Sequence, residues 1–383
     1  MTIEKFAINI PDQVLADLQQ RLSGIRWPDE LHDAAWDYGS NLAYMKSLVE
    51  YWRTGYDWRV HEAALNRLPQ FRLSVDGQPL HSIHVRGKGP APLPLIITHG
   101  WPGSFLEMTK ILPLLTDPAA NGGNAEDAFD VVVPSLPGYG FSDRPRERGM
   151  DPTRIAALWV RLMEELGYAR FGAQGGDWGS TVSIALGLNH AKRMIGIHLN
   201  YIAGRFLLGG SLEQAQSDDG TKDYLQELRG WWDREGGYSH IQATRPQTLS
   251  YGLNDSPVGL AAWIIEKFRT WSDCGGDVES VFTRDELLTN VMIYWITQTI
   301  ASSARLYYET RERPLRLSPS SRVEPPVAVA MFPGEIAMPP RALAERGLNI
   351  TRWTAMPKGG HFAAMEQPEL LARDIREFFR TLR

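Results

Sequence analysis

Gln174-Gly175-Gly176-Asp177-Trp178-Gly179-Ser180 is the stretch that decides how the rest of this chain is interpreted. Small residues stand two positions before and two positions after Asp177, as a sharp strand-to-helix turn requires when it lifts one strained side chain above a sheet. Serine usually occupies the centre of this turn. An aspartate there attacks an sp³ carbon and becomes an ester, which predicts alkyl transfer followed by hydrolysis. The motif is short, and an aspartate that only caps a helix is the alternative.

Strand and helix patterns alternate on both sides of this turn. Two alternating segments, residues 71–75 and 81–85, flank Asp76-Gly77 and predict a β-hairpin. The later segments predict an α/β fold with a doubly wound, mostly parallel sheet and a ligand site at the carboxyl ends of the strands. The expected strands are residues 93–98, 129–133, 170–173, 194–199, 326–332 and 349–354, and the expected helices are residues 105–115, 152–166, 178–188 and 368–382.

Two segments depart from this alternation. Residues 1–68 show no alternating strand pattern, and we expect a helical N-terminal extension that wraps around the core. Residues 204–321 are helical in pattern and predict a cap inserted between the two parts of the core, residues 69–203 and 322–383. The proline-rich stretch 314–326 is expected to be the linker that returns from the cap to the core.

The composition predicts a globular, cytoplasmic protein. The chain has 383 residues, 43% of them hydrophobic, and a net charge of −5 with both signs interspersed. A phosphate backbone demands a basic surface, so nucleic acid is not an expected partner. We find no secretory signal and no run of the ~18 to 20 apolar residues that a membrane span needs. The single cysteine, Cys274, excludes an intramolecular disulfide. The oligomeric state is left open, a homodimer included.

An ester on Asp177 needs a general base that activates water and an acid that orients the base. His361 lies in a glycine-led loop, residues 358–362, between the last expected strand and the last expected helix. Glu335 follows directly on the preceding expected strand. The chain order nucleophile, acid, histidine is the one that a nucleophile-elbow fold uses, so we expect Glu335 to orient His361. For each residue the alternative is a side chain without a catalytic role.

The oxyanion formed on Asp177 needs hydrogen-bond donors. The expected donors are the backbone N–H groups of Trp178, next to the nucleophile, and of Trp101, in the tight loop HGWPGS at residues 99–104. The oxygen that leaves the attacked carbon needs a proton, which a neutral tyrosine can supply. Spacing alone does not choose among the thirteen tyrosines.

Five segments together resemble the microsomal-type epoxide hydrolases of the α/β-hydrolase superfamily, and the resemblance covers nearly the whole chain. They read HGWPGS (residues 99–104), GGDWGS (175–180), LNDSPVGLAAW (253–263), DELLTNVMIYW (285–295) and GGHFAA (359–364), and YWRTGYDW at residues 51–58 extends the match into the N-terminal part. The resemblance implies an α/β-hydrolase fold with a helical cap. It also implies that Asp177 is the nucleophile, Glu335 the charge-relay acid and His361 the water-activating base.

The resemblance also selects the tyrosines. Tyr238 and Tyr307 match the two cap tyrosines that polarise the epoxide in this family, and Tyr307 is preferred to its neighbour Tyr308. The N-terminal membrane anchor of the animal members has no counterpart here, so membrane association is not expected. The chain resembles the soluble bacterial and fungal members instead, which serve natural-product pathways or detoxification.

The sequence therefore predicts an epoxide hydrolase that needs no cofactor and no metal. Its expected partners are water and a small apolar or aromatic epoxide, because tryptophan and phenylalanine are abundant and line apolar pockets. A haloalkane dehalogenase is the nearest alternative, since it uses the same aspartate, acid and histidine. A catalytically silent ligand-binding protein that kept the pocket is the alternative from another class. The tyrosine pair and the N-terminal extension favour the epoxide.

Overall fold

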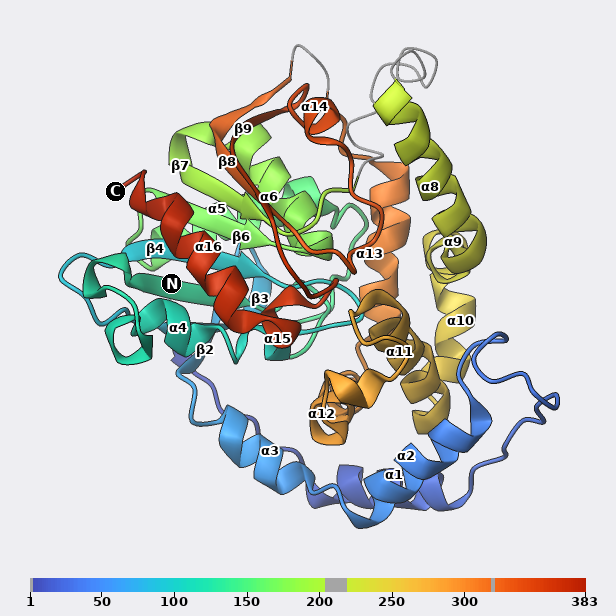
Figure 1. The fold of residues 1–383 in the computed structure, drawn as a ribbon. Helices are drawn as coiled ribbons and strands as arrows, with labels where there is room; N and C mark the ends of the chain where they lie inside the picture. Colours follow the sequence, from blue (N-terminus) through green and yellow to red (C-terminus); the bar gives the residue numbers. More distant parts are fainter. Residues whose placement is uncertain (1–2, 204–218, 318–320) are drawn as a thin grey trace.

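Within residues 3–203, 219–317 and 321–383, which the computed structural model describes, nine strands form one β-sheet (Figure 1). The order across the sheet is β1-β2-β3-β5-β4-β6-β7-β8-β9. The strands are β1 (Glu4–Lys5), β2 (Gln70–Val75), β3 (Gln78–Val85), β4 (Leu93–Thr98), β5 (Phe129–Pro134), β6 (Phe171–Gly175), β7 (Met194–Leu199), β8 (Val323–Met331) and β9 (Leu348–Ala355).

The sheet is antiparallel at one edge and parallel elsewhere. β2 and β3 form the expected hairpin around Asp76-Gly77, and β3 runs antiparallel to β5. From β5 across to β9 all neighbouring strands are parallel. The predicted doubly wound, mostly parallel sheet is confirmed. Because Thr98 at the end of β4 pairs with Gly175 at the end of β6, the loops that follow these two strands start side by side.

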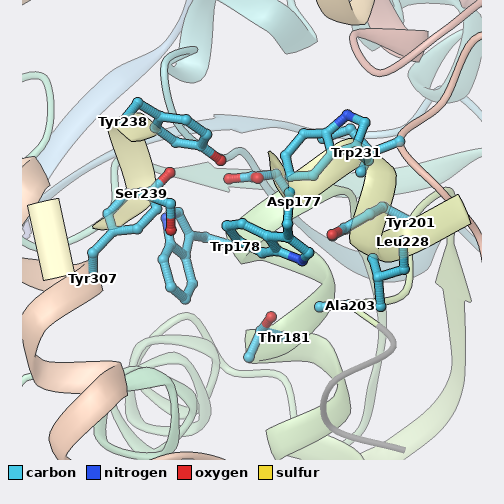
Figure 2. Close-up of a pocket in the computed structure, with 12 residues that line it drawn as sticks. Asp177, Trp178, Thr181, Tyr201, Ala203, Leu228, Trp231, Tyr238, Ser239 and Tyr307 are labelled. Carbon is cyan, nitrogen blue, oxygen red and sulfur yellow. The ribbon is translucent and has the colours of Figure 1, made fainter. Parts of the chain in front are cut away.

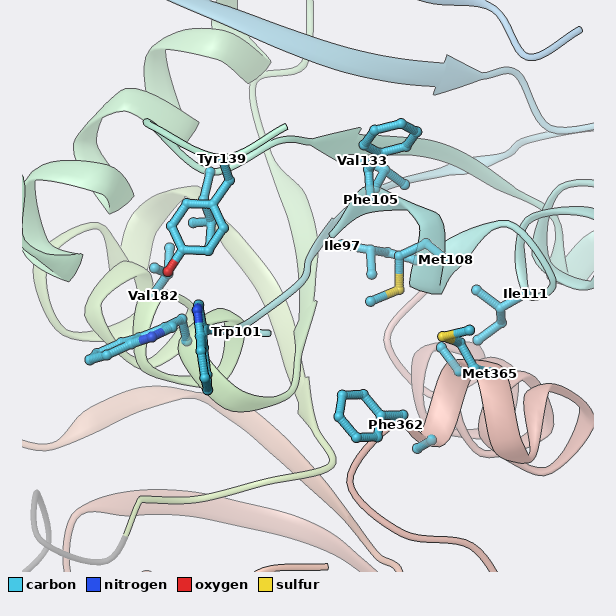
Figure 3. Packing of buried hydrophobic residues seen from close by; sticks show 14 of the residues in the cluster. Ile97, Trp101, Phe105, Met108, Ile111, Val133, Tyr139, Val182, Phe362 and Met365 are labelled. Atoms are coloured by element: carbon cyan, nitrogen blue, oxygen red, sulfur yellow. The ribbon is translucent and has the colours of Figure 1, made fainter. Parts of the chain in front are cut away.

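Helices cover both faces of the sheet. On one face α5 (Pro152–Glu165) packs against α6 (Asp177–Asn189), and on the other α4 (Leu112–Thr116) packs against α16 (Pro368–Arg380) (Figure 1). α6 is apolar on almost every side because the sheet and α5 enclose it, and ten of its residues are buried. Figure 3 shows part of the apolar core, with Phe105, Met108 and Met365 among its buried side chains.

The cap consists of helices that lie between β7 and β8 in the chain. They are α8 (Asp219–Glu235), α9 (Gly237–Thr244), α10 (Pro246–Leu253), α11 (Pro257–Trp271), α12 (Arg284–Thr297) and α13 (Ile300–Glu312). Residues 204–218, at the expected start of the cap, and residues 318–320, in the expected return linker, lie outside the described residues. The domain boundaries therefore stay a prediction.

The N-terminal extension lies along the cap (Figure 1). Its helices α1 (Asp12–Ser23) and α2 (Leu42–Thr54) contact α11, and α3 (Trp58–Leu65) contacts α12. The remaining short helices are α14 (Arg341–Ala344), α15 (Ala363–Glu366), η1 (Phe105–Met108), η2 (Ala119–Asn121), η3 (Ala125–Asp127), η4 (Ala191–Arg193) and η6 (Val278–Ser280). Throughout the described ranges, no helix combines the length and apolarity that crossing a membrane requires.

Three local expectations differ from the structure. β1 adds two residues of the extension to the sheet edge, a strand too short for alternation to reveal. The expected helix over residues 105–115 splits into the 3-10 helix η1 and the short α4, because Pro113 has no N–H to continue one helix. The end of the expected linker already belongs to β8, which begins at Val323 and not at Pro326 as expected, and its two prolines lie at a shift in the pairing with β9 where ladder hydrogen bonds are already interrupted.

Candidate active site

Asp177 lies on a tight turn between β6 and α6, as predicted. Its φ angle is 43°, a left-handed conformation that is uncommon for a residue other than glycine. Gly175 and Gly179 are required because other backbone segments pass too close to them for a side chain. A Cβ on Gly175 would overlap the backbone of Gly179, and a Cβ on Gly179 would overlap the backbone of Thr98. The turn therefore brings the carboxylate of Asp177 to the carboxyl end of the parallel strands.

His361 lies between two carboxylates. Its Nε2 is 3.5 Å from Oδ2 of Asp177, and its Nδ1 is 2.5 Å from Oε1 of Glu335. The same Oε1 accepts a hydrogen bond of 2.7 Å from the backbone N–H of Ile336, which fixes the glutamate. Both loops follow neighbouring strands, β8 and β9, and a bridge between Gly334 and Gly360 holds them together. The structure thus brings together the predicted nucleophile, acid and base.

The two carboxylates decide the charge of this histidine. Burial alone would lower the pKa of His361, but the charge of Glu335 and the hydrogen bond with Asp177 outweigh it and raise the pKa well above its usual value. The side chain of His361 is 3% exposed, so water screens these charges little. In the free protein the imidazole is therefore expected to be an imidazolium.

The loop after β4 supplies the first predicted oxyanion donor. The backbone N–H of Trp101 donates a hydrogen bond of 2.7 Å to Oδ1 of Asp177. Gly100 permits this approach, because a Cβ there would overlap the Asp177 side chain. The second predicted donor, the backbone N–H of Trp178, stands at the first turn of α6, and its role stays a prediction.

A pocket opens above Asp177 towards the cap, and both predicted tyrosines line it (Figure 2). The hydroxyl of Tyr238, from α9, points towards the Asp177 carboxylate in Figure 2. Its ring stacks on Trp101 at 5.1 Å with an interplanar angle of 7°. Tyr307, from α13, packs edge-on against Trp178 at 4.8 Å, and burial raises its pKa well above the usual value. Its neighbour Tyr308 is not among the residues that line the pocket.

Three residues near the site were not singled out from the sequence. Tyr201 lines the pocket and lies edge-on to His361, with ring centroids 5.6 Å apart. Trp271, the last residue of α11, contacts the rings of Trp101, Tyr238 and His361, and its carbonyl accepts a hydrogen bond of 2.8 Å from the His361 backbone N–H. Glu107 in η1 is 8% exposed and lines a small cavity with Asp177 and His361.

Only one of the three had a usable signal in the sequence. Glu107 is an acid inside the apolar run Phe105-Leu106-Glu107-Met108, and a carboxylate in such a run is unusual enough to question. Tyr201 and Trp271 are aromatic residues among many. Within the described ranges, no group of three or more histidine, cysteine, aspartate or glutamate side chains could hold a metal ion.

The fold, with the turn that carries Asp177 at the carboxyl end of the parallel strands, defines a class of protein, the α/β hydrolases. A family model described as "alpha/beta hydrolase fold" matches residues 94–235, and one described as "Epoxide hydrolase N terminus" matches residues 3–108. Epoxide hydrolase 1 of Oryctolagus cuniculus is 39% identical over 98% of this chain and 88% of its own length. A protein of Stigmatella aurantiaca is 45% identical over 100% of this chain and 86% of its own. The chain belongs to the epoxide hydrolase family.

Solved structures agree with this assignment. The epoxide hydrolase of Aspergillus niger superposes with a TM-score of 0.86 at 28% identity, covering 100% of this chain and 97% of that one. The juvenile hormone epoxide hydrolase of the silkworm Bombyx mori gives a TM-score of 0.85 at 31% identity, covering 100% and 94%. The predicted α/β-hydrolase fold and the predicted family are confirmed.

Proposed function

We propose that this protein converts an epoxide to a vicinal diol through a covalent ester on Asp177. One observation carries the proposal: the Asp177 carboxylate faces two cap tyrosines in the pocket and also contacts His361 and the backbone N–H of Trp101. When the nucleophile opens an epoxide, the ring oxygen becomes an alkoxide and needs a proton donor that faces the nucleophile. Hydrolysis of the resulting ester needs a base and an oxyanion donor. The positions of Tyr238, Tyr307, His361 and Trp101 around Asp177 support these proposed roles.

In the first half-reaction, a carboxylate oxygen of Asp177 attacks an epoxide carbon and the carbon–oxygen bond of the ring breaks. Tyr238 and Tyr307 hold the epoxide oxygen, and one of them gives its proton to the alkoxide that forms. Burial keeps Tyr307 protonated at neutral pH, which suits a hydrogen-bond donor. The product is a hydroxyalkyl ester of Asp177, and the tyrosine regains a proton from solvent.

In the second half-reaction, water attacks the carbonyl carbon of the Asp177 ester. Nε2 of His361 takes the proton of this water, and Glu335 stabilises the imidazolium through Nδ1. The backbone N–H of Trp101, with that of Trp178 as the second proposed donor, stabilises the oxyanion. Collapse of the tetrahedral intermediate breaks the ester bond, and the leaving alkoxide takes the proton from His361 to give the diol.

The first step prepares the base for the second. The negative charge of Asp177 helps to hold a proton on His361 in the free protein. Esterification removes that charge, so the pKa of His361 falls and the neutral base forms when the ester is ready for hydrolysis. Formation of the ester thereby favours the neutral form of His361 that its hydrolysis needs.

We propose a small apolar or aromatic epoxide as the substrate, and the lining of the pocket supports this. Aromatic side chains dominate the lining, including Trp178, Tyr201, Trp231 and Trp232. Water is the only other reactant, and the chemistry needs no cofactor or metal. We also propose a cytoplasmic location, supported by Cys274, the single cysteine, which is buried and unpaired.

Trapping the ester tests the covalent mechanism. His361→Gln should form the ester and hydrolyse it at least 10³-fold more slowly, because the water loses its base. A mass increase equal to one substrate molecule, mapped to the peptide with Asp177, is the expected result. Absence of any adduct in His361→Gln, with a panel of styrene-type, terminal and trans-disubstituted epoxides, contradicts the proposal.

Two further measurements use the unmodified protein. In water enriched in oxygen-18, the label should enter the Asp177 carboxylate over successive turnovers. Label found in the diol after a single turnover, with none passing through Asp177, argues against an ester. A bromoalkane assayed beside the epoxides separates the alternatives: bromide release without diol formation indicates a dehalogenase, and no turnover of either indicates a silent binding protein.

A further inference from the structure

Asp177 forms the wall between two cavities. The pocket described above is lined by the cap tyrosines, whereas a second, smaller cavity is lined by His361, Trp101, Glu107 and Gln174. Among the residues that the structure describes, Asp177 is the only one that lines both. The base therefore borders the second cavity and is absent from the lining of the first.

The size of the second cavity fits one water molecule. Its volume is about 20 Å³, and a single water needs on the order of 10 to 15 Å³ of such space and two to four polar partners. Polar partners are present. Gln174 donates a hydrogen bond of 2.8 Å through Nε2 to Asn200, while its buried Oε1 has no partner among the described residues. A buried carbonyl oxygen of this kind usually binds a water.

Glu107 is an ionisable group at this cavity to which the proposed mechanism gives no role. It is buried, and no lysine or arginine is paired with it among the described ion pairs. Burial raises its pKa to about 8, so the carboxyl group is neutral at pH 7. A neutral carboxyl group accepts a hydrogen bond from water through its carbonyl oxygen without adding a charge to the cavity.

The oxyanion loop is built around this carboxyl group. A Cβ on Gly103 would overlap Oε1 of Glu107, in the way that a Cβ on Gly100 would overlap Asp177. The flanking residues Phe105 and Met108 pack into the apolar core (Figure 3). The close approach of Gly103 and the burial of the neighbouring apolar residues therefore hold the Glu107 side chain at the cavity.

We propose that the small cavity holds the water that hydrolyses the Asp177 ester, and that Glu107 binds and orients this water. The inference rests on the proposed covalent mechanism. The water oxygen attacks the Asp177 carbonyl carbon, one water proton passes to Nε2 of His361, and the other O–H donates a hydrogen bond to Glu107. Glu107 neither gains nor loses a proton. Water and epoxide thus approach Asp177 from separate cavities.

Glu107→Met tests the proposal because methionine has nearly the same length and shape but cannot orient water. Single-turnover kinetics should show ester formation at an unchanged rate, within about 2-fold, and ester hydrolysis slowed by about 10- to 100-fold. The ester should accumulate in the steady state and be seen by mass spectrometry. Glu107→Gln keeps a hydrogen-bonding group of the same size and should restore hydrolysis to within about 3-fold of the unmodified protein.

A matched control comes from another 3-10 helix. Glu126 in η3 is exposed and remote from the site residues in the fold, so Glu126→Met should leave both half-reactions unchanged. Hydrolysis at the unmodified rate in Glu107→Met, or an equal slowing in Glu107→Met and Glu107→Gln, overturns the proposal. If Glu107→Met does not fold, Glu107→Asp replaces it. Its carboxyl group is one carbon short of the cavity, and it should slow hydrolysis while Glu107→Gln does not.

The outcomes separate this proposal from the mechanism on which it rests. An ester trapped in His361→Gln, with normal hydrolysis in Glu107→Met, rejects only the role of Glu107. No ester in His361→Gln rejects the covalent mechanism itself.

Discussion

Asp177 is served by two regions that are built in different ways. The sheet core contributes the proposed base, its proposed acid and a proposed oxyanion donor from loops that follow β9, β8 and β4, so strand pairing fixes their separations. The cap contributes Tyr238 and Tyr307 from α9 and α13, whose positions depend on helix packing. The difference suggests a division of labour: the core performs the chemistry common to any ester on Asp177, and the cap decides which molecule forms it.

The largest expected effect comes from replacing the proposed nucleophile, which belongs to the sheet core. Asp177→Asn should reduce turnover by at least 10⁴-fold, because an amide is a poor nucleophile for an epoxide carbon. Diol formation measured by chiral chromatography checks this. Asp76 also has a positive φ, of 48°, and lies in the hairpin turn away from the site, so Asp76→Asn is the matched control and should keep full activity. Undiminished turnover in freshly purified Asp177→Asn would refute the role of Asp177 as nucleophile.

The dependence of stability on pH tests the protonation state of Glu107 in the core. In the folded protein the pKa of Glu107 is raised from 4.5 to about 8. Between these values the folded state keeps a proton that the unfolded chain has lost, so this group makes stability fall as pH rises. Glutamine does not titrate. We therefore compare the free energy of unfolding of Glu107→Gln with that of the unmodified protein. The difference, variant minus unmodified, should increase by about 3 kcal/mol from pH 5 to pH 7, at about 1.4 kcal/mol for each pH unit.

Denaturant titration of both proteins across pH 4 to 9 measures this difference. Titrating groups that do not interact with Glu107 contribute equally to both proteins and cancel in the comparison. A difference that is flat with pH would show that Glu107 titrates normally in the folded protein.

The smallest of these effects concerns the cap. Tyr238→Phe and Tyr307→Phe should each slow ester formation by about 10- to 100-fold and leave ester hydrolysis unchanged, because in the proposed mechanism the hydroxyls act only on the epoxide oxygen. Pre-steady-state kinetics separates the two steps. Tyr308→Phe, one position along α13 and outside the pocket lining, is the control and should change neither step. Slower hydrolysis in the cap variants would contradict a strict division of labour between cap and core.

The same division explains what the sequence could predict. Strand β4 was placed at residues 93–98, as observed, and the glycines around Asp177 marked the turn, because both patterns are local. His361 and Glu335 could be placed because each follows a strand of one parallel sheet. Spacing did not single out Tyr238 or Tyr307, since helix packing in the cap has no comparable local signature. They were found only through resemblance to a family, and their catalytic role stays a prediction.

Other features escaped because their cause is three-dimensional. The two prolines in β8 suggested a linker, and only the interrupted pairing with β9 shows why a strand tolerates them. Burial of Glu107 depends on contacts of the whole loop, so its acid character in an apolar run could be noticed but not interpreted. The split between two cavities requires side-chain positions from the loops after β4, β6 and β9 together.

Trp271 has a consequence for engineering this protein. It ends a cap helix, yet its carbonyl holds the backbone of His361, and its ring contacts Trp101 and Tyr238. A cap transplanted from a relative to change selectivity would therefore also reposition the base and the oxyanion loop. Chimeras that replace Trp271 are expected to change both the rate and the selectivity. Chimeras that keep this tryptophan and its carbonyl contact with His361 should allow the selectivity to be altered alone.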